Sequence, residues 1–176
     1  MKKVSMKEIY ETAESLIIAF VVITVLILFV FRAVSVDGDS MLPNLHDKDR
    51  IITTNLFYNA QKGDVVVVDK NTKYGKPLIK RVIATAGDKI VVDYSTGDVY
   101  VNNEKLIENY IAEKIYIQDR ENVDTVVPEG YVFVMGDNRN YSLDSRDEAI
   151  GFINEKNILG KALLQIYPIS DIGVVK

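Results

Sequence analysis

The longest apolar stretch of the chain runs from Leu16 to Phe31 and is interrupted only by Thr24. A helix of roughly 16 residues is about 24 Å long, somewhat shorter than the ~30 Å hydrocarbon core of a bilayer. Small and apolar residues extend the stretch on both sides, and Arg32 can place its charge among the lipid headgroups. The pattern therefore predicts one transmembrane helix over residues 16–34.

Two other interpretations compete for this stretch. A buried core helix would show a polar face at helical spacing, which the stretch lacks. A cleavable secretory signal would end at small residues such as Ala33-Val34-Ser35, but the apolar run is longer than a usual signal core and three glutamates precede it. Because lysines lie near the start of the chain, we expect residues 1–15 on the cytoplasmic side of the membrane and residues 35–176 outside.

Beyond residue 35 the pattern changes to short runs of β-branched and aromatic residues separated by turns. Strands are expected at Arg50–Thr54, Val65–Val68, Leu78–Ala84, Ile90–Val92, Val99–Val101, Tyr131–Val134 and Ala162–Tyr167. Asn102-Asn103 predicts a tight turn, and Asn154–Leu159 has a helical pattern. Many short strands with Gly and Asp turns predict a mainly β fold, with a sheet or barrel-like core and a small β cap inserted over about residues 93–130.

Composition excludes several classes of function. The formal net charge is −4, which argues against nucleic acid as the main partner. The absence of cysteine excludes a disulfide framework and a thiol nucleophile. The one histidine, His46, leaves no multi-histidine metal site, so we expect neither a metal nor another cofactor.

Ser40 follows the predicted anchor by a few residues, in the segment Val36–Asn44. Gly38 permits unusual backbone angles, and a small turn of this kind can expose a hydroxyl and aim main-chain N–H groups at an oxyanion. An ordinary surface turn would have the same composition. Ser40 is therefore a candidate nucleophile only if a base lies near it.

Lys80 is a candidate for that base. A serine hydroxyl needs a general base, and a lysine with its ordinary pKa is protonated and cannot serve. Strand alternation places Lys80 on one face with Leu78 and Val82, and burial among apolar side chains lowers a lysine pKa. The competing interpretation is an edge-strand lysine with a solvated ammonium. His46 is the alternative base, but its neighbours predict a solvated loop.

The segment Gly136–Arg146 is a dense polar loop that directly follows an apolar strand. Loops mounted on a sheet edge are where functional residues concentrate. Asp144 and Arg146 could pair and fix the loop, while Ser142 could hydrogen-bond a lysine amine. A solvent-exposed turn is the plainer interpretation.

Three motifs occur in order after the predicted anchor: Ser40-Met41-Leu42-Pro43, Lys80-Arg81-Val82 with Gly87-Asp88, and the polar loop Gly136–Arg146. Together they resemble bacterial type I signal peptidases, also called leader peptidases, and the resemblance covers essentially the whole chain. Each motif alone is weak, whereas the ordered set is specific.

The resemblance implies a Ser/Lys endopeptidase anchored in the bacterial plasma membrane, with its catalytic domain outside, Ser40 as nucleophile and Lys80 as general base. Ser142 would orient the lysine, with Asp144 and Arg146 as a supporting pair. The Ser40 amide would supply one oxyanion donor. Some relatives have a serine where this chain has Gly38, so a side-chain donor is missing here. The chain also departs from the family pattern at Asn44, Ala84 and Ala86, where Thr, Gly and Pro are usual.

The implied substrates are secreted precursor proteins, cut after small residues at −3 and −1. Met41 and Leu42 are candidates for lining the substrate pockets. The cluster Leu56-Phe57-Tyr58 could lie on the bilayer or pack in the core. Two rival functions are a soluble, self-cleaving Ser/Lys repressor and a membrane-tethered β-domain that only binds partners. The anchor argues against the first, and the presence of both Ser40 and Lys80 argues against the second.

Overall fold

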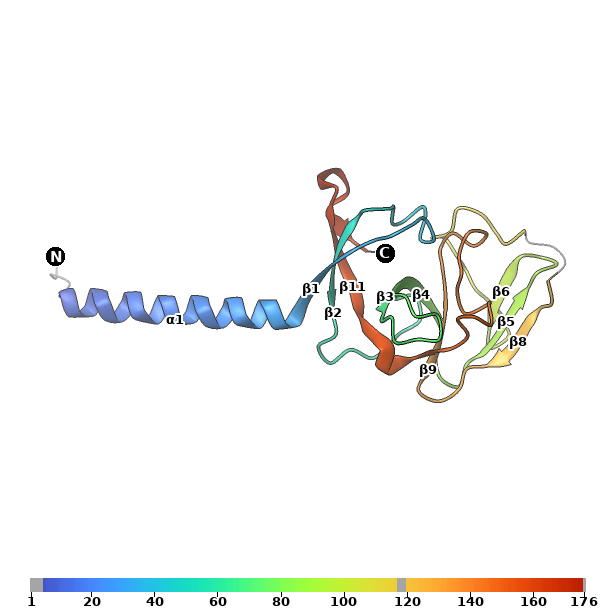
Figure 1. The fold of residues 1–176 in the computed structure, drawn as a ribbon, viewed down its shortest axis with the longest axis horizontal. Helices are drawn as coiled ribbons and strands as arrows, with labels where there is room; N and C mark the ends of the chain where they lie inside the picture. The colour runs from blue at the N-terminus through green and yellow to red at the C-terminus, as the bar shows by residue number, and fades with distance from the viewer. Residues whose placement is uncertain (1–4, 117–119, 176) are drawn as a thin grey trace. The chain divides into compact units, whose positions relative to one another are not determined.

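The computed structural model describes residues 5–116 and 120–175 (Figure 1). The chain divides between Arg32 and Ala33 into two compact units. The first contains a long helix and the second contains almost all of the β-structure. The prediction of a mainly β fold preceded by one apolar helix is confirmed.

The helix α1 spans Met6–Val30. It begins at a capping box, in which the Ser5 hydroxyl accepts from the Glu8 amide while the Glu8 carboxylate accepts from the Ser5 amide. It ends because Phe31 is extended, with φ −111° and ψ 140°. The helix thus starts ten residues before the expected span and stops four residues before its expected end. Thr24 bonds its hydroxyl to the Phe20 carbonyl at 2.8 Å, so this polar side chain is satisfied within the helix.

Most strands of the second unit form one eight-stranded sheet. Its order is β1-β2-β11-β3-β4-β9-β10, with β12 also paired to β11. The strands are β1 Phe31–Ser35, β2 Arg50–Thr54, β3 Val65–Val68, β4 Leu78–Ala84, β9 Tyr131–Met135, β10 Ile153–Asn154, β11 Ile158–Tyr167 and β12 Gly173–Val174. In the described pairings, β1 and β10 are the edge strands, each with one neighbour, so the sheet does not close into a barrel.

Strand β3 consists of four valines and carries no polar residue, because both of its faces are covered. It lies between β11 and β4, and all four valines are buried. Val66 and Val68 pack into one apolar cluster, while Val65 and Val67 pack into another. Both faces of the strand are therefore covered, which a continuous apolar run predicts better than an alternating one.

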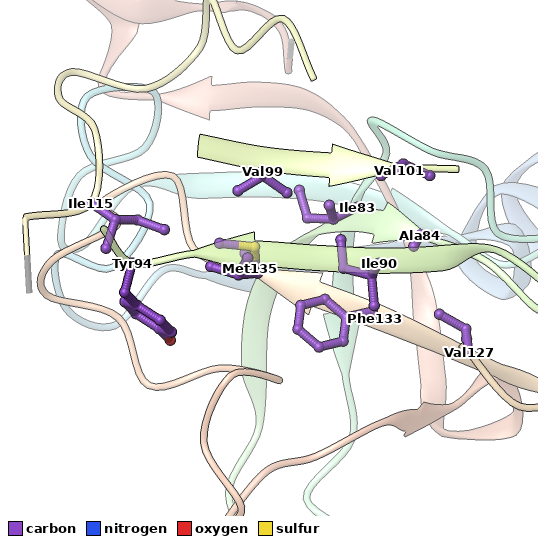
Figure 2. Packing of buried hydrophobic residues seen from close by; sticks show 11 residues of the cluster. Ile83, Ala84, Ile90, Tyr94, Val99, Val101, Ile115, Val127, Phe133 and Met135 are labelled. Atoms are coloured by element: carbon purple, nitrogen blue, oxygen red, sulfur yellow. The ribbon is translucent and has the colours of Figure 1, made fainter. Parts of the chain in front are cut away.

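The second, four-stranded sheet has the order β7-β6-β5-β8. Its strands are β5 Lys89–Asp93, β6 Asp98–Val101, β7 Glu104–Lys105 and β8 Val123–Val126. Its core includes side chains of the large sheet, as Figure 2 shows for Ile83 of β4 with Phe133 and Met135 of β9. The segment 93–130, predicted as a β cap, contains most of this sheet, but the sheet begins earlier, at β5.

Two local predictions have opposite outcomes. Asn102 and Asn103 adopt φ of 53° and 68°, which confirms the tight turn between β6 and β7. The helical pattern at Asn154–Leu159 is wrong, because only Glu155–Asn157 form a short 3-10 turn (η1), capped by the Asn154 side chain. Residues 158 and 159 already belong to β11, which is therefore longer than the predicted strand.

Candidate active site

Ser40 lies in the turn between β1 and β2. Gly38 adopts φ +83°, a left-handed conformation that favours glycine, and its amide donates to Asp47 Oδ1 at 2.9 Å. The side chain of Met41 is buried in the core. The backbone of Ser40 is therefore fixed on both sides, by the hydrogen bond from Gly38 to Asp47 and by the buried side chain of Met41.

Lys80 lies in the middle of β4, opposite Val66 of β3. Val66, Leu78 and Val82 belong to the same apolar cluster, as strand alternation predicted for the last two. Lys80 is only 3% exposed. Its ammonium nitrogen donates to Ser40 Oγ at 2.7 Å and to the Ile79 carbonyl at 3.0 Å. The structure therefore brings the two central predicted residues into direct contact.

The environment of Lys80 changes its protonation. Burial lowers the pKa of Lys80 to about 8, while the negative charges of Asp144 and Asp137 act in the opposite direction. At pH 7 roughly a tenth of this lysine is therefore neutral, and the fraction rises as the pH approaches 8. A neutral amine in contact with a hydroxyl can accept its proton.

The polar loop after β9 holds the Ser40 turn from one side. Asn138 donates its backbone N–H to the Ser40 carbonyl and its side-chain amide to the Asp39 carbonyl, both at 3.0 Å. Gly136 makes this approach possible, because a Cβ there would overlap the Ser142 side chain and the Ser40 carbonyl oxygen. The loop and the turn could not pack together with a larger residue at position 136.

Asp144 and Arg146 form a buried, two-bonded ion pair in this loop. The distances are 2.7 Å from Arg146 Nε to Asp144 Oδ1 and 2.8 Å from Nη2 to Oδ2. Asp144 also accepts from the Gly136 amide at 2.9 Å. Burial alone would raise the Asp144 pKa, but these hydrogen bonds and the Arg146 charge outweigh it and lower the pKa. The two side chains are therefore paired, and Asp144 also ties the loop to the backbone of Gly136.

Ser142 lies beside this pair but does not bond to Lys80. Its hydroxyl oxygen is buried and has no hydrogen-bond partner among residues 5–116 and 120–175. The Ser142 side chain packs against Gly136, as the Ser40 carbonyl oxygen also does. The structure thus places the Ser142 hydroxyl at the site, close enough to Asp144 to contribute to the lowering of the pKa of that carboxyl.

A second layer of buried charges lies behind the first, and the sequence did not predict it. Arg81 pairs with Asp137 through two bonds, of 2.7 Å from Nε and 2.6 Å from Nη2. Arg139 pairs with Glu108, and its Nε donates to the Gly136 carbonyl at 3.1 Å. The sequence features that could have indicated this layer are Arg81, directly after Lys80, and the charged residues Asp137 and Arg139 in the polar loop.

A cavity of about 490 Å³ opens at Ser40 and Lys80. It lies between two stretches of chain, one including residues 34–37 and the other residues 76–80. Met41 is among the lining residues and Leu42 is not. The side chain of His46 is 60% exposed and lies 3.9 Å from Asp49, not at Lys80 or in the cavity lining. Within the described part of the chain, no group of three acidic or histidine side chains is arranged to hold a metal ion.

Known proteins are similar to this sequence over most of its length. The family model described as "Signal peptidase, peptidase S26" matches residues 9–167. Signal peptidase I S of Bacillus subtilis (strain 168) is 32% identical, over 94% of this chain and 92% of its own. Signal peptidase IB of Staphylococcus aureus (strain COL) is 35% identical, over 94% and 93%.

A crystal structure of a signal peptidase I from Enterococcus faecalis V583 has 28% identity to this chain, with a TM-score of 0.47. It covers 59% of this chain and 97% of its own. The family model matches most of this chain, and both relatives are more than 30% identical to it over more than nine-tenths of each sequence. The chain belongs to the signal peptidase family, peptidase S26.

Proposed function

We propose that the protein is a serine endopeptidase in which Ser40 is the nucleophile and Lys80 the general base. The observation that carries this proposal is the 2.7 Å contact between Lys80 Nζ and Ser40 Oγ at a buried site. Neutral Lys80 takes the hydroxyl proton as Oγ attacks the scissile carbonyl carbon. The resulting ammonium then gives that proton to the leaving amine, and Lys80 next activates the water that hydrolyses the acyl-enzyme.

The oxyanion of the tetrahedral intermediate needs hydrogen-bond donors. The Gly38 amide is already used by Asp47, and glycine supplies no side-chain donor. The Ser40 amide has no acceptor within residues 5–116 and 120–175. We therefore assign the Ser40 amide as the main-chain donor to the oxyanion.

The supporting roles go to Ser142, Asp144 and Arg146. The buried Ser142 hydroxyl suits a partner for the Lys80 amine once Ser40 Oγ has become part of the acyl-enzyme. The Asp144–Arg146 pair holds the loop that carries Ser142. The negative charge of Asp144 also favours the protonated form of Lys80 and so helps the base to accept its proton.

The proposed substrates are secreted precursor proteins, cut at the end of their signal peptides. The cavity beside Ser40 has apolar walls that include Val36, Met41 and Ile79. The family resemblance implies small side chains at the −3 and −1 positions, and these walls offer them apolar contacts. Leu42 does not line it, so we retain Met41 alone as a direct contact for these side chains.

A lipid bilayer is the second proposed partner. The 25 residues of α1 would be about 37 Å long, enough to span a membrane, and an 18-residue window has a mean hydropathy of 2.8. We propose a cytoplasmic N-terminus and an extracytoplasmic catalytic domain, because lysines near the start of the chain favour retention inside.

A turn of the catalytic domain also fits the bilayer surface. Leu56 is 56% exposed and Phe57 is 95% exposed, with Phe57 in a left-handed conformation at φ 51°. Tyr58 instead packs against the core and donates to Asp64 at 2.8 Å, which fixes the turn. We propose that Leu56 and Phe57 contact lipid, while Tyr58 does not.

Cleavage of a detergent-solubilised precursor with Ala at −3 and −1 tests the function. The wild-type protein should cut after the −1 Ala, as the product masses would show, and a precursor with Phe at −1 should stay intact. Ser40→Ala should cut neither. A wild-type protein that leaves both precursors intact would favour the binding-module alternative.

A further inference from the structure

We propose that Asn44 is a positioning residue that fixes the Ser40 turn against the strand that carries Lys80. Its side-chain amide donates two hydrogen bonds, one to the Tyr110 carbonyl at 2.6 Å and one to Asp137 Oδ2 at 2.8 Å. The acceptors lie 66 and 93 residues away in the sequence. This inference rests on the proposed Ser/Lys mechanism and adds to it a residue that touches neither the substrate nor the reacting atoms.

Asn44 and Ser40 belong to the same tight turn. The amides of Asn44 and Leu45 both donate to the Met41 carbonyl at 3.0 Å. Met41 is the direct neighbour of Ser40 and is buried in the core. A displacement of Asn44 would therefore be transmitted through the turn to the backbone of Ser40.

Asp137 connects this turn to β4. Its carboxylate is held by Arg81 through two bonds of 2.6 and 2.7 Å, and Arg81 is the residue after Lys80. Arg81 also donates to the Gly63 carbonyl at 2.7 Å, and its guanidinium lies 4.3 Å from the centre of the Tyr110 ring. The acceptor that holds Asn44 is thus itself fixed to the base-bearing strand.

At position 44, asparagine can make more of these hydrogen bonds than the threonine that is usual in the family. The asparagine amide carries two hydrogens, and each meets an acceptor. A threonine hydroxyl can donate only one hydrogen, and alanine donates none. In this chain, Asn44 joins three segments at once: the Ser40 turn, the Tyr110 segment and the polar loop after β9.

The test compares Asn44→Ala and Asn44→Thr with the control Asn102→Ala in the full-length chain. Asn102 also donates its amide to an aspartate, Asp88, at 2.7 Å, but it lies in the turn between β6 and β7. We expect Asn44→Ala to lower kcat on the Ala-site precursor about tenfold, with KM changed by less than about twofold. Asn44→Thr should lie between Asn44→Ala and wild type.

The pH profile and thermal stability separate positioning from general destabilisation. Because Asn44 is uncharged, the pH midpoint of activity should not move in Asn44→Ala. Asn102→Ala should lose thermal stability while keeping kcat. The inference is overturned if Asn44→Ala keeps the wild-type kcat, or if kcat falls in both variants in proportion to their loss of melting temperature.

Two further results would separate this inference from the proposed function. If Asn44→Ala does not fold, a wild-type kcat in Asn44→Thr overturns the inference and a reduced kcat supports it. An inactive wild-type protein, or an active Ser40→Ala, would instead contradict the proposed function itself.

Discussion

At the scale of single residues, the chemistry depends on a lysine that is buried without an acidic side chain bonded to it. Lys80 contacts a hydroxyl and a carbonyl oxygen, and neither fully replaces the hydration of an ammonium ion. Burial therefore favours the neutral form, and the pKa falls to about 8. The same burial that makes Lys80 a base also makes it a source of instability.

The pH dependence of activity follows directly. Lys80 must be neutral to act as a base, so kcat/KM should rise with pH through a midpoint near 8 and level off above it. A profile that is flat between pH 6 and 10, measured with the Ala-site precursor in detergent, would contradict the assignment of the base.

The pH dependence of stability has a predictable sign. The folded pKa of Lys80 is about 8, below its ordinary value of 10.5, so the unfolded chain binds more protons between these values. The free energy of unfolding should therefore rise with pH between about 8 and 10.5, and the destabilisation by Lys80 has its full size below about pH 8.

Lys80→Met removes this contribution. A difference of 2.5 pKa units corresponds to on the order of 3 kcal/mol, an upper bound that the lost hydrogen bond to Ser40 reduces. Lys80→Met should therefore gain stability relative to wild type at pH 7, and the gain should shrink toward pH 10. Unfolding in denaturant at several pH values measures this, and a pH-independent difference would contradict it.

At the scale of elements, the site is made where a turn, a strand and a loop meet. The strands could be predicted because their apolar runs fit the period of a sheet, and the bounds of β2, β3 and β4 match the prediction. The 3-10 turn η1 could not, because a short polar and apolar segment fits one helical turn as well as the start of a strand.

The site was only partly predictable for a related reason. Ser40 and Lys80 are 40 residues apart, and no spacing rule places them in contact. The resemblance to a family suggested the pair, and the register of β3 and β4 helps to bury the lysine. The Arg81–Asp137 pair joins residues 56 positions apart, so it depends on the fold alone.

Gly136 tests the contact between the loop and the turn. Its Cβ would overlap the Ser142 side chain and the Ser40 carbonyl oxygen, so Gly136→Ala should displace the loop from Ser40. We expect kcat to fall roughly 10- to 100-fold, because displacements near 1 Å have effects of this size.

Gly173→Ala is the matched control. Its nearest contact would be an ordinary 3.9 Å from the Asp171 carbonyl oxygen. This variant should keep the wild-type kcat, and a Gly136→Ala protein that also kept it would show that the close contact is not needed.

At the scale of the whole molecule, an apolar helix and an exposed apolar turn belong to one chain. Burying Phe57 among lipid chains would remove an unfavourable exposure of apolar surface to water. The chain contains no tryptophan, so one introduced at position 57 would be the only indole reporter.

Phe57→Trp in vesicles therefore measures lipid contact. Its emission should shift to shorter wavelength and be quenched by brominated lipids. Ile107→Trp, at a position 80% exposed in the catalytic domain, should show neither effect. A shifted emission that brominated lipids do not quench would indicate a protein contact and contradict the lipid proposal.

The central claim is that Ser40 and Lys80 form one catalytic unit, and it is tested most directly by precursor cleavage in three matched proteins. Wild type, Ser40→Ala and Lys80→Met would be compared as folded, full-length chains on the Ala-site precursor. We predict that wild type cuts after the −1 Ala and that both variants are inactive. A folded Lys80→Met protein with near wild-type rate would contradict the claim and direct attention to His46 as the base.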